Sequence, residues 1–116
     1  MNSDLTRTDV IKLIAVATKP LNLRGVSLLS IDLHYLSLSK ANLSEANLSG
    51  ANLTLAYLRK ANLRYANLSG ANLSGANLSE ANLEEANLEG ANLSGVNLSE
   101  ASIGGANLTG VKEYTK

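Results

Sequence analysis

Residues 66–80 have the sequence ANLSGANLSGANLSE, three copies of a five-residue unit in direct succession. The same spacing continues in both directions from residue 21 to residue 110, which gives 18 consecutive pentads without an insertion. The first residue of each pentad is aliphatic, the third is Leu in 17 pentads and Ile103 in the other, and eight of the nine glycines stand fifth. So regular an internal repeat outweighs local propensities, because every copy should adopt the same structure.

A five-residue period fits neither an α-helix nor an extended strand. In a helix of 3.6 residues per turn, successive pentads rotate by about 140°, which would spread the leucines around the whole cylinder. In a strand, a shift of five residues would place successive leucines on opposite faces. The remaining solution bends the chain once per pentad, so that the two aliphatic positions point inward and small polar residues form the outside and the bend. Stacked coils of this kind bury a continuous apolar column and form a solenoid.

The composition agrees with a narrow interior. Of the 116 residues 45% are hydrophobic, but Trp and Phe are absent and there are four Tyr, so Leu and Ala must fill the core. This length suits a single domain. The absence of Cys excludes disulfides, thiolate metal sites and cysteine nucleophiles. Ten basic residues balance ten acidic ones, so the net charge points to neither a basic nor an acidic partner.

The Ala-Asn-Leu-Ser-Gly units and their variants resemble the A(D/N)LXX signature of the pentapeptide-repeat family, over residues 21–110. The resemblance implies an all-β solenoid, a right-handed quadrilateral β-helix with four pentads to a coil. Eighteen pentads would then form about four and a half coils. Some members of the family also carry an N-terminal helix.

The ends of such a solenoid need caps, because they expose unpaired backbone groups and an apolar cross-section. Thr6 and Asp9 predict a capping box that opens a helix over residues 6–18, and Pro20 prevents its continuation. The first positions of the first coil are larger than the Ala used later, and we expect them to pack against this helix: Leu21, Val26, Ile31 and Leu36. The chain is thus divided into a capping helix and linker (1–20), the repeat (21–110) and a C-terminal tail (111–116).

Groups able to perform catalysis or bind a metal are scarce. His34 is the single His, which excludes a His-rich metal site, and we interpret it as a surface residue in the fourth position of its pentad. Four carboxylates lie close together in sequence, but four pentads per coil distribute them over three different faces: Glu80, Glu84, Glu85 and Glu89. We therefore expect a protein that is not an enzyme, with no cofactor and no metal.

A coil of twenty residues also predicts contacts between residues far apart in sequence. Lys60 should meet Glu80, and Arg64 should meet Glu84, each on the adjacent coil. Exposed ion pairs of this kind contribute about 0–1 kcal/mol each. The Asn side chains in second positions should stack and share hydrogen bonds along the solenoid.

The sequence favours a rigid scaffold or protein–protein interaction module with an unidentified protein partner. The alternative is a DNA-mimicking inhibitor or protector of a gyrase-type topoisomerase, as the resemblance implies for some family members. Residues 65–110 contain five Glu and no basic residue, but residues 21–64 contain five basic residues, and a mimic needs negative potential along its whole length. Three basic residues beside Tyr57 and Tyr65 make a weak electrostatic footprint, so we expect no direct nucleic-acid partner: Arg59, Lys60 and Arg64.

The N-terminal segment does not predict a membrane partner or export. The longest apolar run, residues 13–17, is far shorter than a membrane span. Asp4, Asp9 and Lys12 interrupt the pattern of a signal peptide. The cytoplasm is therefore the expected compartment.

A few outward side chains depart from an otherwise polar surface and are candidates for partner binding. Tyr35 and Leu55 stand twenty residues apart in fifth positions, so they should stack at one corner, with Tyr57 beginning the next face. An aromatic centre with a basic rim is typical of binding hot spots. The alternative is that these side chains pack on each other and stiffen the solenoid. The residues expected beside them are His34, Arg59 and Lys60.

The C-terminal end offers no segment long enough for a second capping helix. The last coil contains Ile103 and Leu108, followed by Val111. We expect this coil to pair with the same coil of a second chain, which would give a homodimer.

Overall fold

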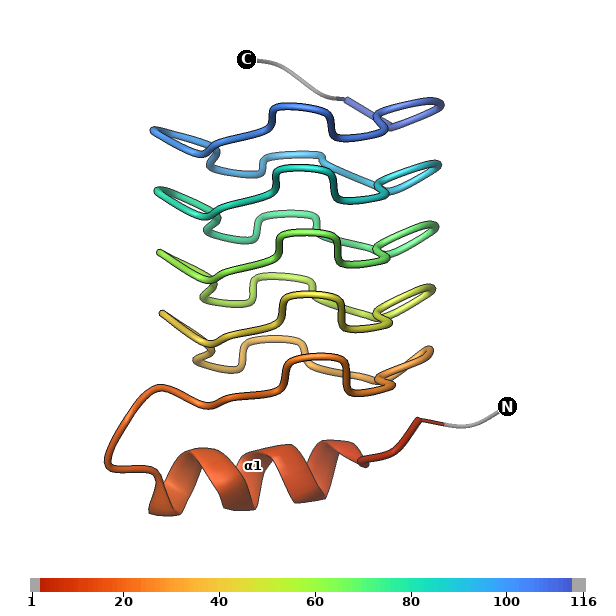
Figure 1. The fold of residues 1–116 in the computed structure, drawn as a ribbon. Helices are drawn as coiled ribbons and strands as arrows, with labels where there is room; N and C mark the ends of the chain where they lie inside the picture. Colours follow the sequence, from red (N-terminus) through yellow and green to blue (C-terminus); the bar gives the residue numbers. More distant parts are fainter. Residues whose placement is uncertain (1–2, 114–116) are drawn as a thin grey trace.

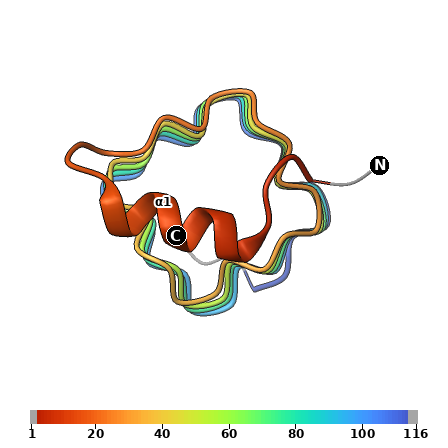
Figure 2. The ribbon, with the colours of Figure 1, turned by 90° about the horizontal axis from the view of Figure 1, so that it is seen from below.

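The computed structural model describes residues 3–113; residues 114–116 of the predicted C-terminal tail and residues 1–2 lie outside the described part. Stacked four-cornered coils form the body of the molecule, and one helix, α1 (Arg7–Val16), lies across their N-terminal end (Figure 1). Viewed along the axis, successive coils superpose closely (Figure 2). In the described residues, the β-structure consists of single-residue parallel bridges instead of longer strands.

The bridges set the register of the coils. Each joins second positions twenty residues apart, as in the pairs of Asn42 with Asn62 and of Asn62 with Asn82. The Leu43 N–H donates to the Asn62 carbonyl at 2.7 Å, and the Asn62 N–H donates to the Ala41 carbonyl at 2.9 Å. Four pentads therefore complete one coil, as the family resemblance implies, and each coil is held to the next by backbone hydrogen bonds.

A tight turn ends every pentad. The Ala66 N–H donates to the carbonyl of Leu63 three residues earlier, at 3.0 Å, and the same bond recurs around the solenoid. The fifth residue of all 18 pentads has a positive φ, between 55° and 73°. Glycine adopts this left-handed conformation without steric cost, whereas for an L-residue the conformation costs about 1–2 kcal/mol of folding free energy. The turn therefore explains why glycine concentrates at the fifth position.

The Asn side chains act within their own pentad. Asn62 Oδ1 accepts a hydrogen bond from the Arg64 N–H at 3.0 Å, and the same bond forms at each second-position Asn. The Asn positions stack as predicted, since Asn62 pairs with Asn42 and Asn82. The predicted hydrogen bonds between their side chains are not found within residues 3–113, where each Asn oxygen accepts the N–H two residues later in its own turn. Asn52 Nδ2 does donate across coils, to Asp32 Oδ1 at 3.3 Å.

The interior is a column of Leu and Ala. Third-position leucines from Leu23 to Leu93 have at most 4% of their surface exposed, and first-position alanines from Ala41 to Ala91 at most 1%. Side chains of the last coil are only partly buried, because no further coil covers them within the described residues: Val96, Leu98, Ile103, Ala106 and Leu108.

The predicted capping box opens α1. Thr6 Oγ1 accepts the Asp9 N–H at 3.1 Å, and Asp9 Oδ2 accepts the Thr6 N–H at 2.9 Å. The backbone hydrogen bond from Thr6 lowers the pKa of the Asp9 carboxyl, and the Thr6 side chain lowers it further. The helix ends at Val16, two residues before the predicted end, with Ala17 as its C-cap in extended geometry.

The helix packs on the first coil through a narrow stripe. Val10 is completely buried, and Leu5 and Ile14 are partly buried against the core, which confirms the predicted cap. Three large apolar side chains of the helix remain exposed, since the flat end of a coil contacts a single side of a helix: Ile11, Leu13 and Val16.

Candidate functional site

The corners of the solenoid differ in their fifth-position side chains. One corner is almost bare, with the column Ser30, Gly50, Gly70, Gly90 and Gly110. The next corner along the chain carries Tyr35 and Leu55, followed by two glycines. The Tyr35 N–H donates to the Thr54 carbonyl at 3.0 Å, which places Tyr35 and Leu55 on adjacent coils as predicted.

Tyr35, Leu55 and Tyr57 are exposed side chains on adjacent coils and neighbouring faces, called the apolar surface from here on. Their exposed fractions are 58%, 39% and 52%. Leu55 leans over the next coil, where a Cβ placed on Gly75 would lie 2.7 Å from Leu55 Cδ2. Tyr57 bridges Ser37 and Asn77 in the second position of the following face. In other pentads the second-position Asn accepts a hydrogen bond from the N–H of the fourth residue, as Asn62 does from Arg64. Within residues 3–113, no side chain accepts the corresponding N–H of Arg59.

The basic residues beside this surface differ in their pairing. Arg59 NH2 lies 2.6 Å from Glu80 Oε2. The predicted contact of Lys60 with Glu80 is therefore wrong, because the longer guanidinium from the fourth position reaches the carboxylate instead. The predicted pair of Arg64 with Glu84 is confirmed, at 3.9 Å.

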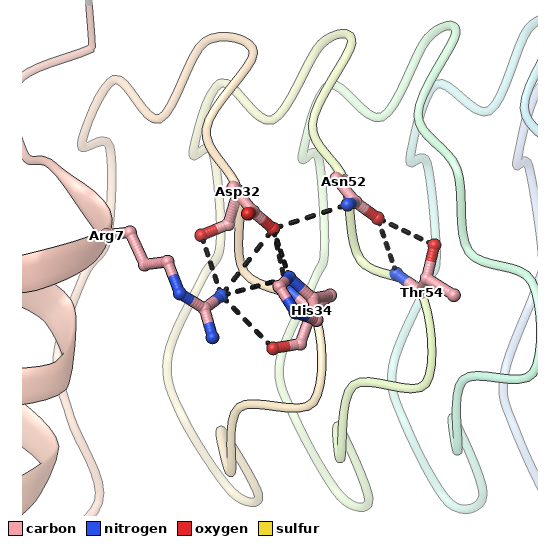
Figure 3. Close-up of polar contacts among 5 residues, drawn as sticks. All are labelled: Arg7, Asp32, His34, Asn52 and Thr54. Atoms are coloured by element: carbon pink, nitrogen blue, oxygen red, sulfur yellow. Dashed lines mark hydrogen bonds and ion pairs between the residues drawn. The ribbon is translucent and has the colours of Figure 1, made fainter.

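His34 belongs to a polar cluster that ties α1 to the first coil (Figure 3). Asp32 stands where most pentads have Asn, and its Oδ1 accepts hydrogen bonds from His34 Nδ1 at 2.6 Å and from the His34 N–H at 3.2 Å. Arg7 NH1 donates to the carbonyls of Asp32 and His34 at 3.2 and 3.1 Å, and lies 3.5 Å from Asp32 Oδ1. The hydrogen bond from the His34 side chain is the main reason that the pKa of the Asp32 carboxyl is lowered.

Arg7 replaces the hydrogen-bond donors of a missing coil. Inside the solenoid, carbonyls in second and fourth positions accept N–H groups from the preceding coil, as Asn42 and Ser44 do. No coil precedes the one that contains Asp32 and His34. The Arg7 guanidinium donates hydrogen bonds to both of their carbonyls instead.

Asp4 supplies hydrogen-bond partners for the first coil on the neighbouring face. Its N–H donates to the Ser27 carbonyl at 2.6 Å, and its Oδ2 accepts the Ser27 N–H at 2.8 Å. The sequence analysis missed both anchors. The available signal was Asp32, an acidic residue in an Asn position next to the single His.

The predicted binding residues therefore fall into two groups. Tyr35, Leu55 and Tyr57 are exposed on adjacent coils and neighbouring faces, with Arg59 and Lys60 following Tyr57 in its pentad. His34 lies at the other edge, where its ring contacts the Tyr35 ring edge-on at a centroid distance of 5.3 Å. Its Nδ1 is already bonded within the cap cluster, so only part of its side chain remains available. Within residues 3–113 there is no group of three or more His, Asp or Glu placed to hold a metal ion.

Comparison with known proteins agrees with this geometry. Pentapeptide repeats match in eight copies over residues 21–50, 37–75 and 76–112. The chain belongs to the pentapeptide-repeat family. No curated protein matches it significantly. No helix in the described part of this pentapeptide-repeat protein is long and apolar enough to cross a membrane.

Two solved structures are similar over most of this chain. A pentapeptide repeat protein from the thylakoid lumen of Arabidopsis thaliana is 36% identical, with a TM-score of 0.77 over 81% of this chain; this chain spans 66% of that protein. A pentapeptide repeat protein from Nostoc PCC 7120 is 34% identical, with a TM-score of 0.78 over 91% of this chain and 88% of its own.

The cap cluster predicts how the stability of this repeat protein depends on pH. Because the pKa of Asp32 is lower in the folded than in the unfolded chain, its stabilising contribution is present at neutral pH and is lost as the pH falls through the lowered pKa. Asp32→Asn keeps an acceptor for the His34 N–H but removes the charge that faces Arg7. We expect this variant to unfold at lower urea concentration than the wild type at neutral pH.

The difference in free energy of unfolding between the two proteins should shrink once the pH falls below the ordinary carboxyl pKa of 3.8. Urea titrations at several pH values measure it. A difference that is independent of pH would contradict the role assigned to the Asp32 charge.

Proposed function

We propose that this chain is a non-enzymatic rigid scaffold that binds a protein partner through the apolar surface. The proposed scaffold is the right-handed β-helix of about four and a half coils that the resemblance to the pentapeptide-repeat family implies. Backbone hydrogen bonds between successive coils support its rigidity. The exposure of Tyr35, Leu55 and Tyr57 on adjacent coils supports the binding role, because the outward positions elsewhere are mostly small or charged.

The residues of the apolar surface lower the stability of the two coils that carry them. Tyr35 and Leu55 have φ values of 64° and 57°, a conformation that glycine adopts at no steric cost. Tyr57 forgoes the side-chain hydrogen bond that Asn makes in this position, worth about 0.5–1.5 kcal/mol. Eight other corners hold a non-glycine residue in the same left-handed conformation, so this surface is distinguished by its large exposed apolar side chains, which we attribute to binding and not to stiffening of the solenoid.

The DNA-mimic alternative receives less support from the charges. Glu80 is paired with Arg59 and Glu84 with Arg64, so part of the acidic half is neutralised within the molecule. A duplex mimic depends on uncompensated negative potential along its length.

The cytoplasm is the proposed compartment, on the charge pattern of residues 4–12 given above.

Substitution of Tyr57 tests the proposed binding surface. Tyr57→Asn restores the repeat consensus and supplies an acceptor for the Arg59 N–H, so the fold should be retained or slightly stabilised. Affinity capture from the native source should yield a partner with the wild type and much less of it with this variant.

The matched control is Tyr65→Asn, which removes a tyrosine of similar exposure (53%) outside the apolar surface. Capture should be unchanged by this control. If Tyr57→Asn retains the same protein as efficiently as the wild type, the apolar surface is not the binding site.

We also propose that the 116-residue chain forms a homodimer through its last coil. Ile103, Leu108 and Val111 are only partly buried, whereas third-position leucines of the inner coils are almost completely covered. Sedimentation equilibrium should show a concentration-dependent dimer, and Leu108→Asn should shift it to monomer. A wild-type monomer at high concentration would rule the dimer out.

A further inference from the structure

Two lysines form a positive column at the end of the face that carries Tyr57. Lys40 and Lys60 stand twenty residues apart in fifth positions, and the Lys40 N–H donates to the Arg59 carbonyl on the next coil at 2.9 Å. Their backbones are therefore about 4.8 Å apart, the usual spacing of paired strands. Like charges on neighbouring strands destabilise each other. Both residues also have left-handed backbones, with φ values of 64° and 62°.

The acidic groups near the apolar surface are already paired. Asp32 accepts hydrogen bonds from His34 and lies 3.5 Å from Arg7 (Figure 3). Glu80 follows Lys60 in the same column, but Arg59 holds its carboxylate. Within residues 3–113, neither lysine ammonium group has an ion pair. The apolar surface is therefore bordered by two uncompensated positive charges.

We propose that the segment bound at the apolar surface is an acidic peptide segment of the partner protein. Its carboxylates pair with Lys40 and Lys60, while an apolar side chain packs against Tyr57 and Leu55. This inference rests on the proposed function and adds the chemistry of the partner. It also accounts for the two lysines, because a bound carboxylate relieves their mutual repulsion.

The dimensions of the face define the spacing within such a segment. Lys60 is three positions after Tyr57 in the sequence, which corresponds to at most about 10 Å along the chain. An extended segment places side chains of the same side about 7 Å apart. A carboxylate two or four residues from an apolar anchor therefore reaches the lysines.

Selection of peptides from a random phage-displayed library tests this proposal. Peptides selected on the immobilised wild type should be enriched in Asp and Glu two or four residues from Leu or an aromatic residue. The same selection on the double variant Lys40→Gly/Lys60→Gly should lose the acidic residues and keep the apolar anchor. The variant should fold, because glycine suits the left-handed conformation of both positions.

Fluorescence anisotropy then measures the affinity of the best wild-type peptide. Loss of two exposed ion pairs should weaken binding to the double variant by roughly 2- to 30-fold. Glu100→Gly is the matched control, since Glu100 shares the corner and the left-handed backbone (φ 62°) but has the opposite charge. This control should not weaken binding.

Three results would overturn the proposal. Neutral or basic peptides whose binding still requires Tyr57 would reject an acidic partner and leave the proposed surface in place. Peptides that bind Tyr57→Asn as well as the wild type would reject the proposed function itself. Failure to enrich acidic peptides, combined with lysine-dependent binding of single-stranded oligothymidylate, would assign the lysines to phosphate groups instead.

Discussion

The left-handed bend at the fifth position of each pentad determines where every other side chain of the solenoid points. This bend closes one turn in each pentad, directly after the third residue. The first and third positions therefore face inward, and the second and fourth face outward. The interior then accepts only small and medium aliphatic residues, which explains a core made of Leu and Ala. The same bend makes glycine the least costly fifth residue, so each other side chain at a corner lowers the stability of the coil.

The ends of the solenoid follow from the same geometry. A coil exposes backbone carbonyls and N–H groups to the next coil, and the first coil has no predecessor. Arg7 and Asp4 supply those missing partners on two faces, while Val10 covers the apolar cross-section. The cap is thus a substitute for one coil, assembled from side chains instead of a repeated backbone.

Much of this structure can be predicted from the sequence because one five-residue unit is repeated along most of the chain. The five-residue period predicted a solenoid that bends once per pentad, and Thr6 with Asp9 predicted the start of α1. The resemblance to the pentapeptide-repeat family implied four pentads per coil, and this register of twenty residues predicted the pairing of Arg64 with Glu84. The failures concern side-chain reach. Arg59 instead of Lys60 holds Glu80, and the Asn oxygens bond within their own turns, because the choice among neighbouring donors depends on distances that a period does not specify.

The candidate site was predictable in outline for a related reason. Tyr35, Leu55 and Tyr57 depart from the repeat, and the register alone brings them together. The involvement of His34 with Arg7 was not predictable, since it depends on how α1 lies across the first coil, and the helix is outside the repeat (Figure 3).

The most direct test of the left-handed bend compares two glycines that differ in backbone conformation. Gly70 has a φ of 66° and open space where a Cβ would lie, so Gly70→Ala changes backbone strain without a clash. Gly104 has no left-handed φ, and a Cβ there would meet only Glu84 Oε2, at 4.0 Å. Urea denaturation should show a loss of about 1–2 kcal/mol for Gly70→Ala and a change within about 0.5 kcal/mol for Gly104→Ala. Equal losses at the two positions would contradict the account.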